Sequence, residues 1–178
     1  MKTVFFDIDT QIDFLFPAGA LYVPGAERIV PAIATLNRYA AAHNIPLVST
    51  MCAHSENDPE FCDWPPHCIV GTTGQLKPQS TLVPQQIILE KQQLDLFTSP
   101  SLLPLLENLA ADEYVVYGVV TEYCVSFAAL GLLATGKPVT IVTDAIQSLA
   151  DEAARSTINR FTERGGRLTT LDQLANAR

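Results

Sequence analysis

Short apolar segments rich in Val, Ile and Phe alternate with segments of helical periodicity along nearly the whole chain. The apolar segments lack the regular polar residues of a half-exposed strand, so each is expected to be buried on both faces, as in a parallel sheet covered by helices. Strands are predicted at 3–7, 46–50, 86–90, 114–119, 139–143 and 167–169, and helices at 26–43, 101–110, 122–135, 151–164 and 171–177. This order predicts an α/β protein, a three-layer doubly wound sandwich with a mainly parallel six-stranded sheet.

Length and charge narrow the class of protein. A chain of 178 residues fits one core, so residues 1–178 are predicted to form one domain. The net charge of −8 argues against nucleic acid and anionic membranes as partners, because both bind basic surfaces. Asp7 interrupts the first apolar run too early for a signal peptide, and no run approaches the ~20 apolar residues of a membrane helix. A cytoplasmic location is therefore expected.

Cys124 lies where the predicted strand 114–119 passes into the predicted helix 122–135. Unpaired amides in a first helical turn favour the thiolate, which is the attacking form of cysteine. Thr121 is predicted to be the N-cap of this helix. Cys124 is therefore a candidate nucleophile, and the alternative is a small buried residue, which is the usual state of a free cysteine.

Titratable residues also follow other predicted strands, at the sheet edge where α/β proteins bind ligands. Asp13 follows the first strand and Lys91 the third. Asp13 could take the thiol proton and later give it to a leaving amine, and Lys91 could keep both groups charged. Amides of Val120 and Cys124 could stabilise an oxyanion. Taken singly, Asp13 also fits a turn aspartate and Lys91 an exposed lysine at a strand end.

The long irregular stretch 51–84 holds three cysteines, two histidines, one tryptophan and five prolines. A loop of this length in a compact domain is usually functional. In a reducing compartment its cysteines indicate metal binding or catalysis more than disulfides. A structural zinc site that includes Cys62 and Cys68 is disfavoured, because the chain has no C-x-x-C pair.

Three segments carry a family pattern in order: DTQIDFL at 9–15, WPPHCIVGTTG at 64–74 and GVVTEYCV at 118–125. They resemble the D-x-Q-x-D-F, W-P-x-H-C-x-x-G-T-x-G and G-V-x-T-D-Y-C-V motifs of the isochorismatase-like cysteine hydrolases, most closely the nicotinamidases and pyrazinamidases. The resemblance runs over nearly the whole chain. It implies a catalytic triad of Asp13, Lys91 and Cys124, and an oxyanion hole at a non-proline cis peptide between Val119 and Val120.

The same resemblance implies an aromatic pocket in which Phe14, Trp64 and Tyr123 flank a flat ring. For Phe14 and Tyr123, ordinary core packing is an equally good interpretation. Relatives of this kind often form dimers or larger rings, so a homo-oligomer is also expected.

Metal binding is implied by the family's D-x-H pair and by the histidine of its W-P-x-H-C loop. His54 and His67 match two of these ligands, whereas Cys52 replaces the aspartate. Thiolate and imidazole suit Zn²⁺ and disfavour Mg²⁺ or Mn²⁺, so a divalent metal, with zinc the best fit, is predicted at Cys52, His54 and His67. Two alternatives remain: a lost metal with Cys52 as a buried thiol, and Asp58 in place of the missing carboxylate.

The function predicted from these residues is hydrolysis of a small carboxamide, such as nicotinamide, to the acid and ammonia. Cys124 would attack the carbonyl, Asp13 would protonate departing ammonia, and water would cleave the thioester. Within the family, isochorismatase-type vinyl-ether hydrolysis is disfavoured by the two metal-site histidines. Other small amides and carbamoyl compounds remain open as substrates.

Two other classes compete with this function. Residues 4–10 also fit the h-h-h-D-x-D-x-T opening of haloacid-dehalogenase-like phosphatases, with Asp7 as nucleophile, Asp9 as acid and Mg²⁺ as metal. That class needs a later pair of acidic residues, and only Asp144 follows the fifth strand. A non-catalytic binding protein on the same fold is disfavoured by the intact set of candidate catalytic residues.

Overall fold

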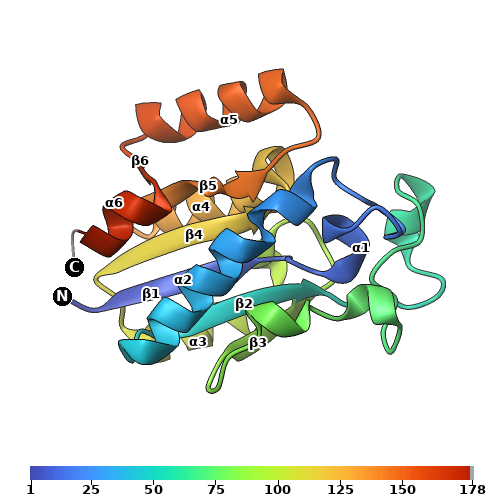
Figure 1. The fold of residues 1–178 in the computed structure, drawn as a ribbon, viewed down its shortest axis with the longest axis horizontal. Coiled ribbons are helices and arrows are strands. Elements are labelled where there is room, and N and C mark those ends of the chain that lie inside the picture. The colour runs from blue at the N-terminus through green and yellow to red at the C-terminus, as the bar shows by residue number, and fades with distance from the viewer. Residues whose placement is uncertain (177–178) are drawn as a thin grey trace.

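Six parallel strands form the centre of the molecule, and helices cover both faces of the sheet (Figure 1). The computed structural model describes residues 1–176. The strands are β1 (Thr3–Ile8), β2 (Leu47–Cys52), β3 (Ile87–Lys91), β4 (Glu113–Val119), β5 (Val139–Gln147) and β6 (Arg167–Thr169). They lie in the order β3-β2-β1-β4-β5-β6, and each neighbouring pair is parallel. The predicted α/β class and six-stranded sheet are confirmed.

The longer helices are α2 (Val30–Ala42), α3 (Leu102–Leu109), α4 (Ser126–Ala134), α5 (Asp151–Glu163) and α6 (Leu171–Asn176). Shorter turns are α1 (Ile12–Leu15), η1 (Ala26–Ile29), η2 (Pro59–Cys62), η3 (Thr73–Gln75), η4 (Gln79–Thr81), η5 (Leu96–Thr98) and the π-helical η6 (Thr121–Val125). None of the helices within residues 1–176 has the length and apolar character that a membrane crossing requires.

Two hydrophobic clusters lie on the two faces of the sheet. One cluster joins α3, α4 and α5 to Phe6, and the other joins α2 and α6 to Phe5. Successive side chains of a strand point to opposite faces, so neighbouring residues of β1 enter different clusters. All six residues of β1 are buried, as the unbroken apolar pattern predicts for a central parallel strand.

Several element boundaries differ from the prediction. The predicted helix 26–43 divides into η1 and α2, because Pro31 lies in the first turn of α2, where it fits best. The predicted helix 122–135 begins with the π turn η6 before α4. Strand β5 continues to Gln147, beyond the predicted 139–143. The predicted last helix includes Ala177, which lies outside the described residues.

The carboxyl ends of β1, β2, β3 and β4 share one edge of the sheet, on the side where segment 53–75 emerges (Figure 1, teal to green). Gly118, near the end of β4, pairs with Ile8, the last residue of β1. It has a φ of 121°, and a Cβ atom there would collide with the backbone carbonyl of Ile8. Glycine is required at this position because only glycine combines this conformation with so close an approach. The close contact brings the ends of β1 and β4 together.

Candidate active site

A buried triad of side chains lies at this edge. Lys91, the last residue of β3, places Nζ 2.8 Å from Oδ2 of Asp9 and donates a hydrogen bond to Sγ of Cys124 at 3.5 Å. The Asp9 carboxylate is close enough to Cys124 to influence the pKa of its thiol. Each of the three residues is no more than 6% exposed. The structure therefore brings together a thiol, a carboxylate and an ammonium from three different elements.

The carboxylate in this triad is Asp9 and not Asp13, which corrects the prediction. Asp13 accepts hydrogen bonds from the backbone amides of Ala20 at 2.9 Å and Cys68 at 2.7 Å, and so connects two loops. The chain turns sharply at Asp9, whose φ is 48°, and α1 then carries Asp13 away from the strand end. Asp9 directly follows β1, so its position at the end of the first strand could have identified it from the sequence as the carboxylate of the triad.

The charges of Asp9 and Lys91 depend on each other. Burial alone would raise the pKa of Asp9, but the nearby Lys91 ammonium lowers it below the ordinary value. Burial alone would lower the pKa of Lys91, but the Asp9 carboxylate raises it well above the ordinary value. Each group therefore holds the other in its charged form, and the two form a buried ion pair.

The thiolate expected for Cys124 is not favoured by its surroundings. Burial raises the pKa of its thiol well above the ordinary value, and the Lys91 ammonium opposes this only in part. Thr121 is not the N-cap, because the cap position falls on Val120 and no side chain caps the turn. Cys124 lies in the π turn η6, a type of turn that often occurs at functional sites. In the resting state, a protonated thiol therefore contacts the Asp9–Lys91 ion pair.

The peptide bond between Val119 and Val120 is cis, as predicted. The carbonyl of Val120 accepts hydrogen bonds from the amides of Tyr123 and Val125, each at 3.1 Å, which closes the π turn around Cys124. Both valines line the same pocket as Cys124. An oxyanion role for the amides of Val120 and Cys124 stays a prediction.

An apolar pocket opens onto the triad. The three predicted aromatic residues Phe14, Trp64 and Tyr123 all line it. The rings of Trp64 and Tyr123 pack edge to face with their centroids 5.4 Å apart. The centroid of the Phe14 ring lies 5.3 Å from that of the His67 ring. Four aliphatic residues also line the pocket: Leu21, Val23, Leu94 and Leu149. The pocket thus has the form expected of a site for a small flat molecule, with reactive groups at one end.

A second group of side chains lies beside the triad. The ligand atoms of Cys52, His54 and His67 all lie within 4.8 Å of one another, and the three residues are buried. Nδ1 of His54 is 3.1 Å from Oδ2 of Asp58, an ion-pair contact, and neither ring nitrogen of His54 has a hydrogen bond of good geometry among the described residues. Nδ1 of His67 is 2.8 Å from the carbonyl of Pro65. Metal-binding histidines are usually oriented in this way through their second nitrogen.

This donor set fits zinc, because one sulfur and two imidazole nitrogens are typical zinc ligands. Asp58 contacts Nδ1 of His54 but is not among the potential ligands that cluster within residues 1–176, so it does not replace the missing carboxylate as a direct ligand. Cys62 is exposed, and Cys68 directs its Sγ to the carbonyl of Gly74 at 4.0 Å. Neither belongs to the group of potential ligands found among residues 1–176.

Cys52 connects the two groups. Its Sγ accepts a hydrogen bond from Nζ of Lys91 at 3.3 Å and lies 3.7 Å from Oδ2 of Asp9. Lys91 therefore contacts the sulfurs of both Cys52 and Cys124. Burial raises the pKa of the Cys52 thiol well above its ordinary value, and the Asp9 carboxylate raises it further.

The phosphatase alternative is not supported by the position of Asp7. The side chain of Asp7 is fully buried and forms an ion pair with Lys77 at 3.3 Å. It does not line the pocket that contains Cys124. A nucleophile must be reachable by its substrate, and Asp7 is enclosed by protein on every side.

Comparison with known proteins gives a consistent result. The isochorismatase domain model matches residues 3–173. A nicotinamidase from Acinetobacter baylyi is 25% identical over 175 residues, covering 80% of this chain and 79% of the relative. The structure of a pyrazinamidase from Pyrococcus horikoshii in complex with zinc has a TM-score of 0.89 and 27% identity, covering 96% of this chain and 99% of that chain. An isochorismatase-like hydrolase from Alkaliphilus metalliredigens has a TM-score of 0.91 and 28% identity, covering 99% of both chains.

Proposed function

Because the chain belongs to the isochorismatase family and is a hydrolase of amide C–N bonds, we propose that it cleaves a small neutral carboxamide such as nicotinamide. The products would be the carboxylic acid and ammonia, formed through a thioester on Cys124. The observation that carries this proposal is the contact of Cys124 with the Asp9–Lys91 ion pair at the end of an aromatic pocket. Nicotinamidases and a pyrazinamidase among the similar proteins support the choice of ring.

The proposed reaction begins with the neutral thiol. As Sγ of Cys124 attacks the amide carbonyl, its proton passes to the neighbouring carboxylate of Asp9. Lys91 stabilises the negative charge that moves between the carboxylate and the sulfur. Protonated Asp9 then gives the proton to the departing nitrogen, and the C–N bond breaks to leave ammonia and the thioester. Water attacks the thioester, Asp9 takes its proton, and the acid is released as the thiol reforms.

Cys52, His54 and His67 would hold a zinc ion next to the pocket. A zinc ion at such a site can polarise a ligand or lower the pKa of water. Cys52 and His67 line the pocket, as do Asp9 and Cys124. The candidate metal site and the triad therefore face the same cavity. These residues would fix the position of a ring nitrogen or of water relative to Cys124.

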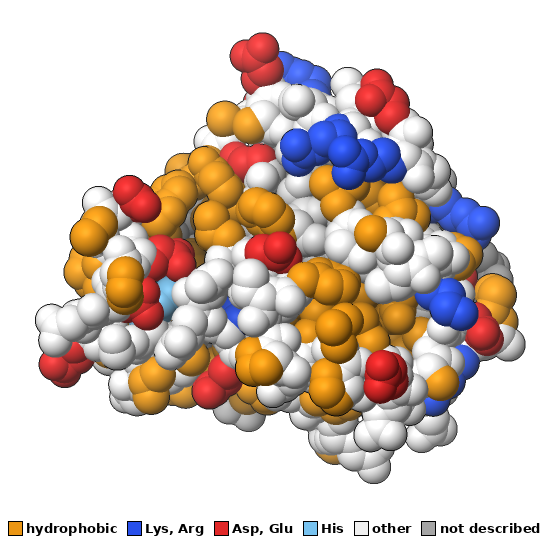
Figure 2. Space-filling model, turned by 180° about the vertical axis from the view of Figure 1, so that it is seen from behind, with side chains coloured by type: hydrophobic (Ala, Val, Ile, Leu, Met, Phe, Trp, Pro, Cys, Tyr) orange, Lys and Arg blue, Asp and Glu red, His pale blue; other side chains and the backbone are white. Residues whose placement is uncertain are grey.

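The charges around the pocket support a neutral substrate. Among residues 1–176 its lining includes Asp9 and Glu60 but no lysine or arginine, and the nearby Lys91 is already paired with Asp9. On the face seen in Figure 2, Lys and Arg side chains gather mainly over α5 and the right-hand edge, whereas acidic side chains surround segment 53–75 at the left. An anionic substrate such as isochorismate would find no lysine or arginine to pair with among the described side chains that line this pocket.

A panel of amides tests the substrate class. Nicotinamide, pyrazinamide and benzamide are expected to release ammonia with a kcat/KM at least about tenfold above that of a matched amide carrying a ring carboxylate, because the acidic pocket repels the second charge. Ammonia release at fixed pH and zinc concentration is the measurement. Equal or better turnover of the anionic amide would contradict the proposal of a neutral substrate.

Zinc affinity tests the role of the metal-site residues. Asp58→Ala is expected to weaken zinc binding about 10- to 100-fold, because His54 loses the carboxylate that orients its ring. Competition with a chromophoric chelator measures the affinity. Asp63→Ala is the matched control, since Asp63 is an exposed aspartate of the same loop. If both variants bind zinc like the unaltered protein, Asp58 does not support the site.

A further inference from the structure

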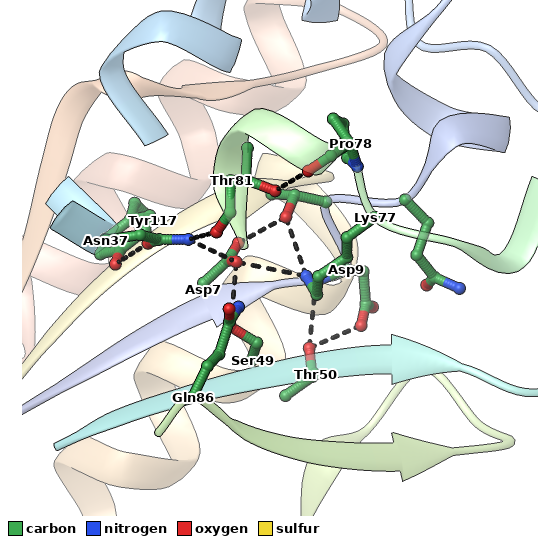
Figure 3. A network of polar contacts seen from close by, with 12 residues as sticks. Asp7, Asp9, Asn37, Ser49, Thr50, Lys77, Pro78, Thr81, Gln86 and Tyr117 are labelled. Carbon is green, nitrogen blue, oxygen red and sulfur yellow. Dashed lines mark hydrogen bonds and ion pairs between the residues drawn. The ribbon is translucent and has the colours of Figure 1, made fainter. Parts of the chain in front are cut away.

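A buried polar network surrounds Asp7 on β1 (Figure 3). Its carboxylate accepts hydrogen bonds from Thr10 at 2.6 Å, Ser49 at 3.0 Å and Asn37 at 3.2 Å, and pairs with Lys77 at 3.3 Å. These residues come from the end of β1, from β2, from α2 and from the loop between η3 and η4. The network therefore joins the long loop to the strand that ends at the active site.

The ion pair between Asp7 and Lys77 is unusual because both side chains are fully buried. Removing two charges from water costs about as much as their attraction returns, so an apolar pair would stabilise the fold at least as well. Neither residue lines the active-site pocket. Neither a gain in stability nor a direct part in catalysis therefore explains why the two charges are buried. The residues around the pair indicate a role in positioning Asp9.

Asp9, two residues after Asp7, has a left-handed backbone conformation with a φ of 48°. Residues other than glycine rarely adopt this conformation, and it persists only where the surroundings hold it. Thr50 holds Asp9 from one side: its Oγ1 accepts from the amide of Asp9 at 3.0 Å and donates to Oδ1 at 2.6 Å.

Thr10 holds the chain on the other side of Asp9. Its Oγ1 accepts a hydrogen bond from Nζ of Lys77 at 2.8 Å and donates one to Oδ1 of Asp7 at 2.6 Å. The residue directly after the left-handed turn is thus tied to the buried ion pair. In an extended conformation, residue 9 would direct its side chain to the same face of the sheet as Asp7.

We propose that Thr10, Lys77 and Asp7 are positioning residues that hold Asp9 in its left-handed conformation, with Oδ2 directed at Lys91. Oδ2 reaches Lys91 at 2.8 Å because the chain turns at this residue. The effect on catalysis rests on the proposed function, whereas the effect on the position of Asp9 does not.

The test uses Thr10→Val, which keeps the branched shape of the side chain and the net charge of the protein. The substitution removes the hydrogen bonds of Thr10 to Lys77 and Asp7. Thr10→Ser restores the hydroxyl group. Thr3→Val is the matched control, because it removes a buried hydrogen bond to Glu113 of 2.6 Å at the other end of β1. For an amide that the unaltered enzyme hydrolyses, Thr10→Val is expected to lower kcat at least about tenfold with KM within about twofold, because a displaced catalytic group slows the chemical step. Thr10→Ser and Thr3→Val are expected to keep kcat.

Crystal structures of the same variants give a readout that needs no substrate. In Thr10→Val, Asp9 is expected to leave the positive-φ region and its Oδ2 to move beyond 4 Å from Nζ of Lys91. If Thr10→Val does not fold, the charge-balanced double variant Asp7→Asn/Lys77→Met is expected to show the same displacement. An unmoved Asp9 in the variant that folds, or an equal loss of kcat in Thr3→Val, would overturn the proposal. If the unaltered enzyme hydrolyses no amide, the proposed function fails and the position of Asp9 still decides this inference.

Discussion

Replacing Cys124 by alanine is expected to reduce kcat for amide hydrolysis by at least about 10⁴-fold, because the proposed acyl intermediate forms on this sulfur. Cys124 lines the pocket and contacts Lys91, and it lies in the turn that follows β4, whereas the other sulfur of the pocket, Cys52, belongs to the candidate metal site. The side chain is small and buried, so alanine in its place leaves the fold intact. Ammonia release measures the loss, and intact mass after rapid quenching should show an acyl adduct only when Cys124 is present.

Cys62→Ala is the control for this substitution. Cys62 is exposed and lies outside the pocket lining, so its removal is expected to leave turnover unchanged. Near-normal turnover in Cys124→Ala would rule out the thioester. Loss of turnover in both variants would indicate general damage from cysteine replacement.

Asp9→Asn is expected to lower kcat about 10²- to 10⁴-fold, the range for loss of a general acid–base group. Asparagine keeps the shape of the side chain but cannot take the thiol proton or return it to ammonia. Asp13→Asn is the matched comparison, since Asp13 binds two backbone amides and does not contact the triad. Its main effects are expected on thermal stability and KM, with kcat changed less than tenfold.

Asp9→Asn also removes the charge that balances buried Lys91, so stability must be measured together with kcat. A thermal melt of each variant separates loss of catalysis from loss of folded protein. A greater loss of kcat in Asp13→Asn than in Asp9→Asn would reverse the assignment of the acid.

The sheet could be predicted from the sequence because central parallel strands are apolar on both faces. Residues 3–7 and 114–119 have this composition, and both became central strands. The π turn η6 could not be predicted in the same way. Its sequence continues smoothly into α4, and a π turn differs from an α turn only in which carbonyl accepts each hydrogen bond.

Some residues of the candidate site could be predicted from the sequence, and others could not. Lys91 ends β3 and Cys124 lies in the turn after β4, so the parallel sheet places both at one edge. The choice between Asp9 and Asp13 depends on a left-handed turn and a helix of one turn, neither of which has a strong sequence signal. The charge of Cys124 was predicted from the helix dipole, but burial has the larger effect on its pKa.

The aliphatic wall of the pocket had no signal at all in the sequence. Leu94 and Leu149 come from loops far apart in the chain, and leucines in loops are common on protein surfaces. Leu149 is still 41% exposed. Only the packing of the two loops beside Trp64 and Tyr123 identifies them as part of the pocket.

The sulfur of Cys52 stands between the two imidazoles on one side and the ammonium of Lys91 on the other. A divalent cation bound by Cys52, His54 and His67 would convert that sulfur to a thiolate, so the sulfur that Lys91 contacts would carry a charge balanced by the metal. The supply of a trace element and the reactivity of the nucleophile would then be coupled through a single atom.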